Sequence, residues 1–338
     1  MTIPARNPGG AETYVSAGGT FILFVLCLFT ARVMPSGECR GRAIACPDNP
    51  GCSNRRGPGS VSEDQPNTNR RSSQITEKEA DDVEEMSSPR APVIYEIVRR
   101  LGDEEMDRPI ISLWWSGVAA GLSISFSLLA QGILQAHLPA APWAILISSL
   151  GYSVGFLIVV LSRQQLFTEN TVTAVLPVMA EMTGGNLIRL SRLWSVVLAA
   201  NLAGTIVAAL LCTYTPVLTP ELKAAMLDVS GHIMHHSWME MMFRAIASGF
   251  LIATMVWLIP SAESAQFHVI VVVTYLIAAG GFMHIIAGSV EGFLLVFNGR
   301  LGLGPMVTDF FVPVLIGNII GGTALFALIA YAQVMKEI

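Results

Sequence analysis

From about residue 109 to its end, the chain alternates between long apolar segments and short polar ones. Windows without Asp, Glu, Lys or Arg cover residues 109–162, 193–220, 245–262, 264–290 and 310–335. About 20 apolar residues cross the hydrocarbon core of a bilayer as an α-helix. The first window is therefore long enough for two spans, and each of the others for one. The pattern predicts an all-α polytopic membrane protein with six spans.

Two of the six spans are expected to be broken. The spans are predicted at residues 110–136, 143–181, 190–213, 240–259, 266–297 and 310–335. Polar residues 163–170 interrupt the second span, and the pair Gly280-Gly281 precedes His284 in the fifth. Adjacent glycines weaken a helix by roughly 1 kcal/mol each. Backbone that opens at membrane depth must be buried in protein or line a cavity, so the breaks are candidate functional positions.

Short motifs recur between the two halves of this region. Residues 119–124 (AAGLSI) resemble residues 247–252 (ASGFLI), and residues 201–205 (NLAGT) resemble residues 318–323 (NIIGGT). Three spans per half reverse the direction of the chain, so the two halves form an inverted repeat. Inverted repeats place a substrate path near the midplane of the membrane, beside broken helices.

The first 90 residues follow a different pattern. They are rich in Pro, Gly, Ser, Asn and charge after a short apolar run at residues 20–29, which favours a disordered N-terminal tail. An alternative is upstream sequence translated from a misassigned start, with Met86 as the true one. The spacing of Cys39, Cys46 and Cys52 fits no zinc pattern.

Residues 91–108 are predicted to form an amphipathic interfacial helix that leads into a channel domain at 109–338. Basic residues indicate the orientation of that domain, because they accumulate on the cytoplasmic side of membrane proteins. Both termini are expected in the cytoplasm, with Lys223 and Arg300 on the other side. The bases on the cytoplasmic side are Arg90, Arg99, Arg100, Arg108, Arg189, Arg192 and Lys336.

Composition narrows the functional classes. Apolar residues make up 52% of the chain and charged residues 13%, and the chain has none of the nucleotide-binding or hydrolase motifs that carry enzyme chemistry. We expect a transport protein in the lipid bilayer rather than an enzyme, with no cofactor, no metal and no nucleic-acid partner. A metal site at His232, His235 and His236 is the disfavoured alternative.

The polar residues inside the spans each have two interpretations. A charged residue in a span costs at least ~2.5 kcal/mol, so it pairs or lines a path. His284 is either a core histidine bonded to a neighbouring helix or part of the substrate path. Arg163 and Glu169 form a structural salt bridge, lie at the cytoplasmic interface or modulate charge in the path, and Glu291 is a further charge modulator.

Five motifs together carry a family resemblance. They are the Arg-Pro pair at 108–109, Leu-Phe-Thr at 166–168, Asn201-x-x-Gly204, Gly281-Phe282-x-His284 and Gly317-Asn318. In order and spacing, residues 108–331 resemble the formate/nitrite transporter family, and most closely a divergent inner-membrane subgroup of it.

The resemblance implies an aquaporin-like fold of six helices in an inverted repeat, assembled as a homopentamer with one pore per protomer. It implies a channel or transporter for a small monovalent weak acid or anion in the bacterial inner membrane, with proton coupling through a central histidine. In the family, a threonine of the broken second helix faces that histidine, between apolar constrictions. The corresponding path residues here are Thr168, His284, Tyr152, Phe156, Leu166, Phe167, Ile277 and Thr254.

The chain departs from the family pattern around the first break and in the fourth span. Gln165 and Glu169 flank Leu-Phe-Thr, and Thr254 stands where the family commonly has Asn. Carboxylates beside the path oppose an anion. A pore for a neutral or cationic solute therefore stays an alternative, as does a non-conducting membrane scaffold or sensor.

Overall fold

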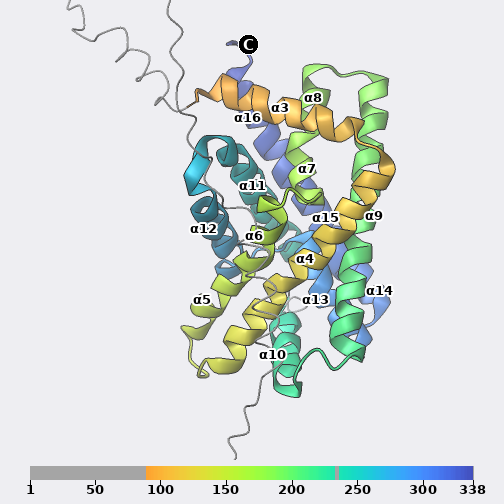
Figure 1. Ribbon diagram of the computed structural model, residues 1–338, viewed down its shortest axis with the longest axis vertical. Coiled ribbons are helices and arrows are strands. Elements are labelled where there is room, and N and C mark those ends of the chain that lie inside the picture. Colours follow the sequence, from red (N-terminus) through yellow and green to blue (C-terminus); the bar gives the residue numbers. More distant parts are fainter. Residues whose placement is uncertain (1–88, 233–235, 338) are drawn as a thin grey trace, which may run out of the picture. The chain divides into compact units, whose positions relative to one another are not determined.

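The computed structural model describes residues 89–232 and 236–337, and within them the regular secondary structure is all helical (Figure 1). The expected tail, the four cysteines before residue 53 and His235 lie outside these residues. The elements, in chain order, are α3 (Ala91–Asp107), α4 (Ile110–His137), α5 (Ala144–Ser148), η1 (Ser149–Tyr152), α6 (Ser153–Leu161), α7 (Phe167–Thr173), α8 (Val175–Ala180), α9 (Gly184–Tyr214), α10 (Pro220–Gly231), α11 (Trp238–Ala262), η3 (Glu263–Ala265), α12 (Gln266–Ala279), α13 (Ile285–Phe297), α14 (Leu303–Pro305), η4 (Met306–Phe311), α15 (Val312–Ile319), η5 (Ile320–Ala327) and α16 (Leu328–Val334).

Five of the six predicted spans contain a helical stretch of membrane length. Among the described residues, the stretches long and apolar enough to cross a bilayer are Ile110–His137, Ala144–Leu161, Gly184–Tyr214, Trp238–Ala262 and Leu303–Val334. The fifth predicted span consists of two shorter apolar helices, α12 and α13. The second span likewise stops at the end of α6 and resumes at α7. The prediction of broken second and fifth helices is confirmed.

Two helix starts differ from the prediction. The third span begins at Gly184 and the sixth at Leu303, several residues before the charge-free windows open. Thr183 caps α9 by accepting a hydrogen bond from the backbone N–H of Asn186, so the cap determines where this helix begins. Absence of charge locates the apolar core of a span, whereas capping residues locate its end.

The two halves pack by the same close backbone contacts. In the first half α4 lies against α9, and in the second α11 lies against α15. A Cβ on Gly121 would lie 2.1 Å from the carbonyl oxygen of Asn201, and one on Gly249 would lie 2.4 Å from that of Asn318. Glycine is therefore required at both crossings, and the sequence repeat corresponds to a repeated helix crossing.

Helix α3 lies across one end of the bundle and α10 lies at the other (Figure 1). Within α3, Tyr95, Val98, Gly102 and Met106 are buried. Val93, Ile97 and Leu101, on another face of the same helix, are exposed. A Cβ on Gly102 would lie 1.9 Å from the carbonyl oxygen of Thr173, so α3 packs directly on the helix that follows the first break.

Helix α10 was not expected from the sequence. Thr219 caps it by accepting from the N–H of Leu222, and Pro220 occupies the first helical position, a pairing that starts helices. Its buried residues, Met226, Leu227 and Ser230, face α4 and α13. This helix forms one wall of the candidate site.

Candidate functional site

The first broken helix is held open by Asn201 of α9. Its side-chain Oδ1 accepts a hydrogen bond of 2.9 Å from the N–H of Phe167, the first residue of α7. Its Nδ2 donates to the carbonyl oxygens of Gly117 (2.9 Å) and Gln165 (2.8 Å). Asn201 is fully buried. One amide side chain therefore satisfies three of the backbone groups that the break and the helix crossing leave open.

The second broken helix is held in the same way by Asn318 of α15. Its Oδ1 accepts from the N–H of Ile285 at 2.8 Å, and its Nδ2 donates to Ala245 (2.8 Å) and Met283 (3.0 Å). Both asparagines belong to the sequence repeat and to the family motif, but neither was predicted to be a site residue. The signal was present, because an asparagine inside an apolar span needs polar partners.

Both breaks turn through a residue with left-handed backbone. Arg163 has φ of 52° and Gly281 has φ of 62°. Leu166 and His284 are the extended residues that precede α7 and α13. Arg163 and Gly281 each lie three positions before the corresponding one. Glycine adopts this conformation freely, whereas an arginine does so at a cost of roughly 1–2 kcal/mol. The same loop is therefore relaxed in one half and strained in the other.

The two breaks meet at Thr168 and His284. Nε2 of His284 lies 2.8 Å from Oγ1 of Thr168, and both side chains are buried. Nδ1 of His284 accepts from the N–H of Ala287 at 3.2 Å and so caps α13. Because Nδ1 accepts, the neutral ring carries its hydrogen on Nε2 and donates it to Thr168.

Aromatic and aliphatic side chains surround this pair. The ring of Phe156 lies edge-on to that of His284 with centroids 5.1 Å apart, and the ring of Tyr152 lies 5.1 Å beyond Phe156. The expected constriction residues Leu166, Phe167 and Ile277 are also buried. Phe167 packs edge-on against Trp194 at 5.8 Å. The hydrogen bond between Thr168 and His284 thus lies in a predominantly apolar setting.

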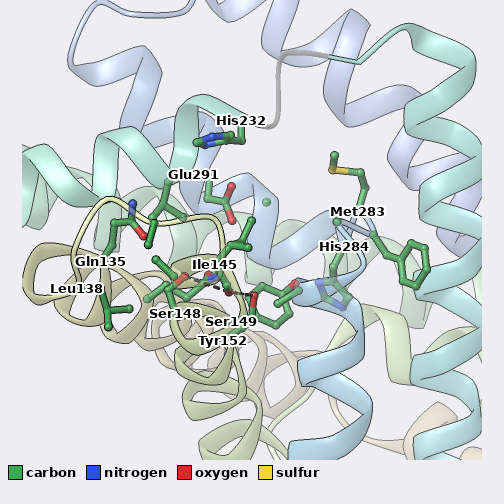
Figure 2. Close-up of a pocket in the computed structure, with 18 of the residues that line it drawn as sticks. Gln135, Leu138, Ile145, Ser148, Ser149, Tyr152, His232, Met283, His284 and Glu291 are labelled. Carbon is green, nitrogen blue, oxygen red and sulfur yellow. Dashed lines mark hydrogen bonds between the residues drawn. The ribbon is translucent and has the colours of Figure 1, made fainter.

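A cavity of about 570 Å³ leads to His284 from the end of the bundle where α10 lies (Figure 2). Tyr152 and Glu291 line it together with His284, and Thr168 is not among its lining residues. The other walls, which the residue patterns did not predict, come from α4, α5, the start of η1, the end of α10, and the residues that follow α10 or precede α11. Their polar lining residues are Gln131, Gln135, Ser148, Ser149, His232 and His236.

Other expected path residues lie elsewhere. The hydroxyl of Thr254 donates to the carbonyl oxygen of Phe250 in its own helix, and Thr254 does not line the cavity. The described residues contain no ion pair between Arg163 and Glu169: Arg163 is exposed, and Oε1 of Glu169 is buried without a hydrogen-bond partner. The structural salt bridge considered for this pair is not formed.

A polar network connects the first break to α3. Nε2 of Gln165 donates to Glu105, which also accepts from Arg108 at 3.0 Å. Oε1 of Gln165 accepts from Asn170 at 3.1 Å. The departure from the family pattern at Gln165 is therefore explained by the hydrogen bonds that its side chain forms with Glu105 and Asn170. In residues 89–232 and 236–337, no three metal-ligating side chains come together to hold an ion.

Two halves of opposite direction, each with a helix broken at the bundle centre, define a polytopic membrane transport protein. A sequence profile of the family described as "Formate/nitrite transporter" matches residues 92–332. The chain belongs to the formate/nitrite transporter family. This membership makes it a membrane channel or transporter and not an enzyme.

Individual relatives agree with this assignment. The chain is 48% identical over 248 residues to "Inner membrane protein YfdC" of Escherichia coli, covering 73% of this chain and 80% of the relative. It is 26% identical over 241 residues to "Formate channel FocA" of Haemophilus influenzae, covering 64% and 84%.

Solved structures share the fold. A "Pentameric formate channel with formate bound" superposes with a TM-score of 0.60 at 21% identity and covers 67% of this chain and 98% of that one. An "FNT family ion channel" superposes with a TM-score of 0.61 at 18% identity, covering 72% and 98%.

Proposed function

We propose that the chain conducts a small monovalent anion or its weak acid, of the size of formate or nitrite, past Thr168 and His284. The observation that carries the proposal is the buried 2.8 Å contact between Nε2 of His284 and Oγ1 of Thr168, at the end of a cavity that opens toward one face of the membrane. Relatives named as formate channels support the substrate class.

The chemistry of the pair suits a small anion. The Nε2–H of His284 donates to Oγ1 of Thr168, and the hydroxyl hydrogen of Thr168 then has no other acceptor among the described residues. That hydroxyl can donate to an anion oxygen, and the histidine polarises it. The neighbouring Phe156, Leu166 and Phe167 make full charge costly, so the permeant crosses most readily as a neutral acid. The proton of that neutral form comes from the solution, because the neutral ring of His284 holds only the Nε2–H that it donates to Thr168.

The same proposal includes the setting of the pore. We infer a homopentamer in the bacterial inner membrane, with one pore per protomer and both termini in the cytoplasm. The named pentameric channel and the named inner-membrane relative support the first two statements. Arg99, Arg100 and Arg108 on or beside α3 support the orientation. The cavity that ends at His284 then faces the periplasm, and we call it the outer vestibule.

Flux into proteoliposomes tests the function. The full chain is expected to carry formate, and His284→Ala is expected to reduce that flux at least tenfold. His284→Asn serves as the matched variant, since its side-chain oxygen can still cap α13 at Ala287 while the ring nitrogen Nε2 is lost. Equal flux in wild type and both variants, for formate, nitrite, acetate and hydrosulfide alike, would overturn the proposed role.

Unpaired carboxylates favour a second candidate, a pore for a neutral or cationic solute. Oε1 of Glu169, the residue after Thr168, is buried and has no hydrogen-bond partner among the described residues. A carboxylate near the path attracts cations and repels anions. The candidate would be supported if a neutral or cationic solute permeated without any anion present and if Glu169→Gln reduced that flux. Anion flux unaffected by Glu169→Gln would argue against it.

A further inference from the structure

Glu291 shares one face of α13 with His284. The two side chains are seven positions apart, which corresponds to about 10.5 Å along a helix. Gly288 lies between them on the same face, and all three residues line the outer vestibule. Figure 2 shows the carboxylate of Glu291 in the cavity between His232 and the aromatic ring of Tyr152. A solute moving toward His284 must therefore pass this carboxylate.

The carboxylate of Glu291 has no counter-charge. Glu291 is 8% exposed, and it takes part in no hydrogen bond or ion pair with the part of the chain that the structure describes. The ion pairs found there all involve α3 or the residue after it. Among the described residues that line the vestibule there is no Lys or Arg.

Few titratable groups face Glu291 across the vestibule. Tyr152 comes from η1, His232 follows α10, His236 precedes α11 and His284 begins α13. Helices α4, α5 and α12 contribute only neutral side chains to the lining. Besides Glu291, the ionisable side chains of the described lining are therefore one tyrosine and three histidines.

We propose that Glu291 is a specificity-determining residue of the outer vestibule, whose carboxylate excludes anions when ionised and admits them when protonated. The proposal rests on the proposed function. Its physical basis is the repulsion between two like charges in a partly enclosed cavity whose described lining carries no Lys or Arg. This repulsion is stronger than in open water. Proton uptake from the outer solution converts the carboxylate to a neutral acid, and its O–H can then donate to the anion. No proton needs to pass to the permeant.

Nitrate distinguishes this role from simple weak-acid permeation. Its charge does not change between about pH 5 and about pH 8, so any pH dependence of its flux comes from the protein. We expect wild-type nitrate flux to be about tenfold greater at the acidic end, because Glu291 is then protonated. Glu291→Gln is uncharged and nearly isosteric, and it should carry nitrate at the higher rate throughout this range.

Matched variants complete the experiment. Glu291→Asp keeps a carboxylate and should keep the pH dependence. Glu221→Gln removes one exposed acid from α10 at the same end of the bundle, outside the vestibule lining, and should behave as wild type. Assembly of each variant is checked by size-exclusion chromatography before reconstitution. A double variant, His232→Gln with His236→Gln, should also retain the pH dependence.

The outcomes distinguish a failure of the proposed role of Glu291 from a failure of the proposed function. If wild type carries neither formate nor nitrate at any pH, the proposed function fails. If wild type carries formate but Glu291→Gln shows an unchanged nitrate profile, only the role of Glu291 is overturned. If the pH dependence of nitrate flux disappears in the histidine double variant and persists in Glu291→Gln, the histidines and not Glu291 control anion entry.

Discussion

Asn201 and Asn318 occupy equivalent positions in the two halves and make equivalent hydrogen bonds. Each accepts from the first N–H of a half-helix, at 2.9 and 2.8 Å, and each donates to one carbonyl of a long helix and one of a break. Because the breaks place Thr168 and His284 in contact, these two amides determine the geometry of the candidate site from outside it.

Replacing either asparagine should destabilise the fold. Asn201→Ala leaves three buried backbone groups without partners, and Asn318→Ala does the same in the other half. We expect each to lower the free energy of unfolding by roughly 2 to 4 kcal/mol, measured by thermal unfolding of the purified protein in detergent. Asn186→Ala, which removes an exposed asparagine from the start of α9, is the control and should change stability little.

Arg163→Gly should stabilise the protein. The left-handed backbone at φ of 52° strains an arginine and not a glycine, and the exposed side chain forms no ion pair with a described residue. We expect a gain of about 0.5 to 1 kcal/mol after allowing for the greater freedom of glycine in the unfolded chain. Arg163→Ala removes the same charge but keeps the strain. Equal stability in the two variants would show that charge, not backbone conformation, matters at this position.

Thr168→Val and Thr168→Ser distinguish the contribution of the Thr168 hydroxyl to flux from the contribution of side-chain packing. Valine has nearly the same shape but cannot accept from Nε2 of His284 or donate to an anion, so formate flux should fall about tenfold or more. Serine keeps the hydroxyl and should retain most of the flux. Stopped-flow measurement in proteoliposomes decides between them. A serine variant as impaired as the valine variant would point to packing by the methyl group.

Acid should weaken the charge network of α3 only at low pH. Hydrogen bonds from Arg99, and then from Arg100, hold the pKa of Glu96 at about 2, below its ordinary value of 4.5. A depressed carboxylate pKa contributes stability above the unfolded value, and that contribution is lost as pH falls through the folded one. The contribution should therefore persist down to about pH 5 and disappear between about pH 4 and about pH 2.

Nuclear magnetic resonance of the side-chain carboxyl carbon of Glu96 provides the check. Its titration midpoint should lie near the depressed value, and Arg99→Gln should raise it, because Arg99 is the principal donor. A midpoint close to 4.5 in the wild type would show that the ion pairs of α3 do not form in solution.

Much of the fold could be predicted from residue patterns. Charge-free windows located the spans because a bilayer admits few charges. The polar run at 163–170 and the glycine pair before His284 located the breaks, because opened backbone at membrane depth needs polar partners. The recurrence of Asn and Gly in both halves indicated the inverted repeat.

Helix ends and the walls of the vestibule could not be predicted in this way. Thr183 and Thr219 start helices by capping, which a hydropathy pattern does not register. The lining of the outer vestibule comes from segments more than 100 positions apart in the chain, such as Gln131 and His236. Their proximity depends on how α4, α10 and α13 pack.

The sequence by itself determined which residues are candidates, because polarity inside an apolar span is costly enough to stand out. Only the tertiary structure decided which of them act together. It joined Thr168 to His284, placed Glu291 in the cavity that ends at His284, and formed no ion pair between Arg163 and Glu169 among the described residues. The physical reason is that hydrogen bonds and charge repulsion act over a few ångström, whereas these partners lie up to 116 positions apart along the chain.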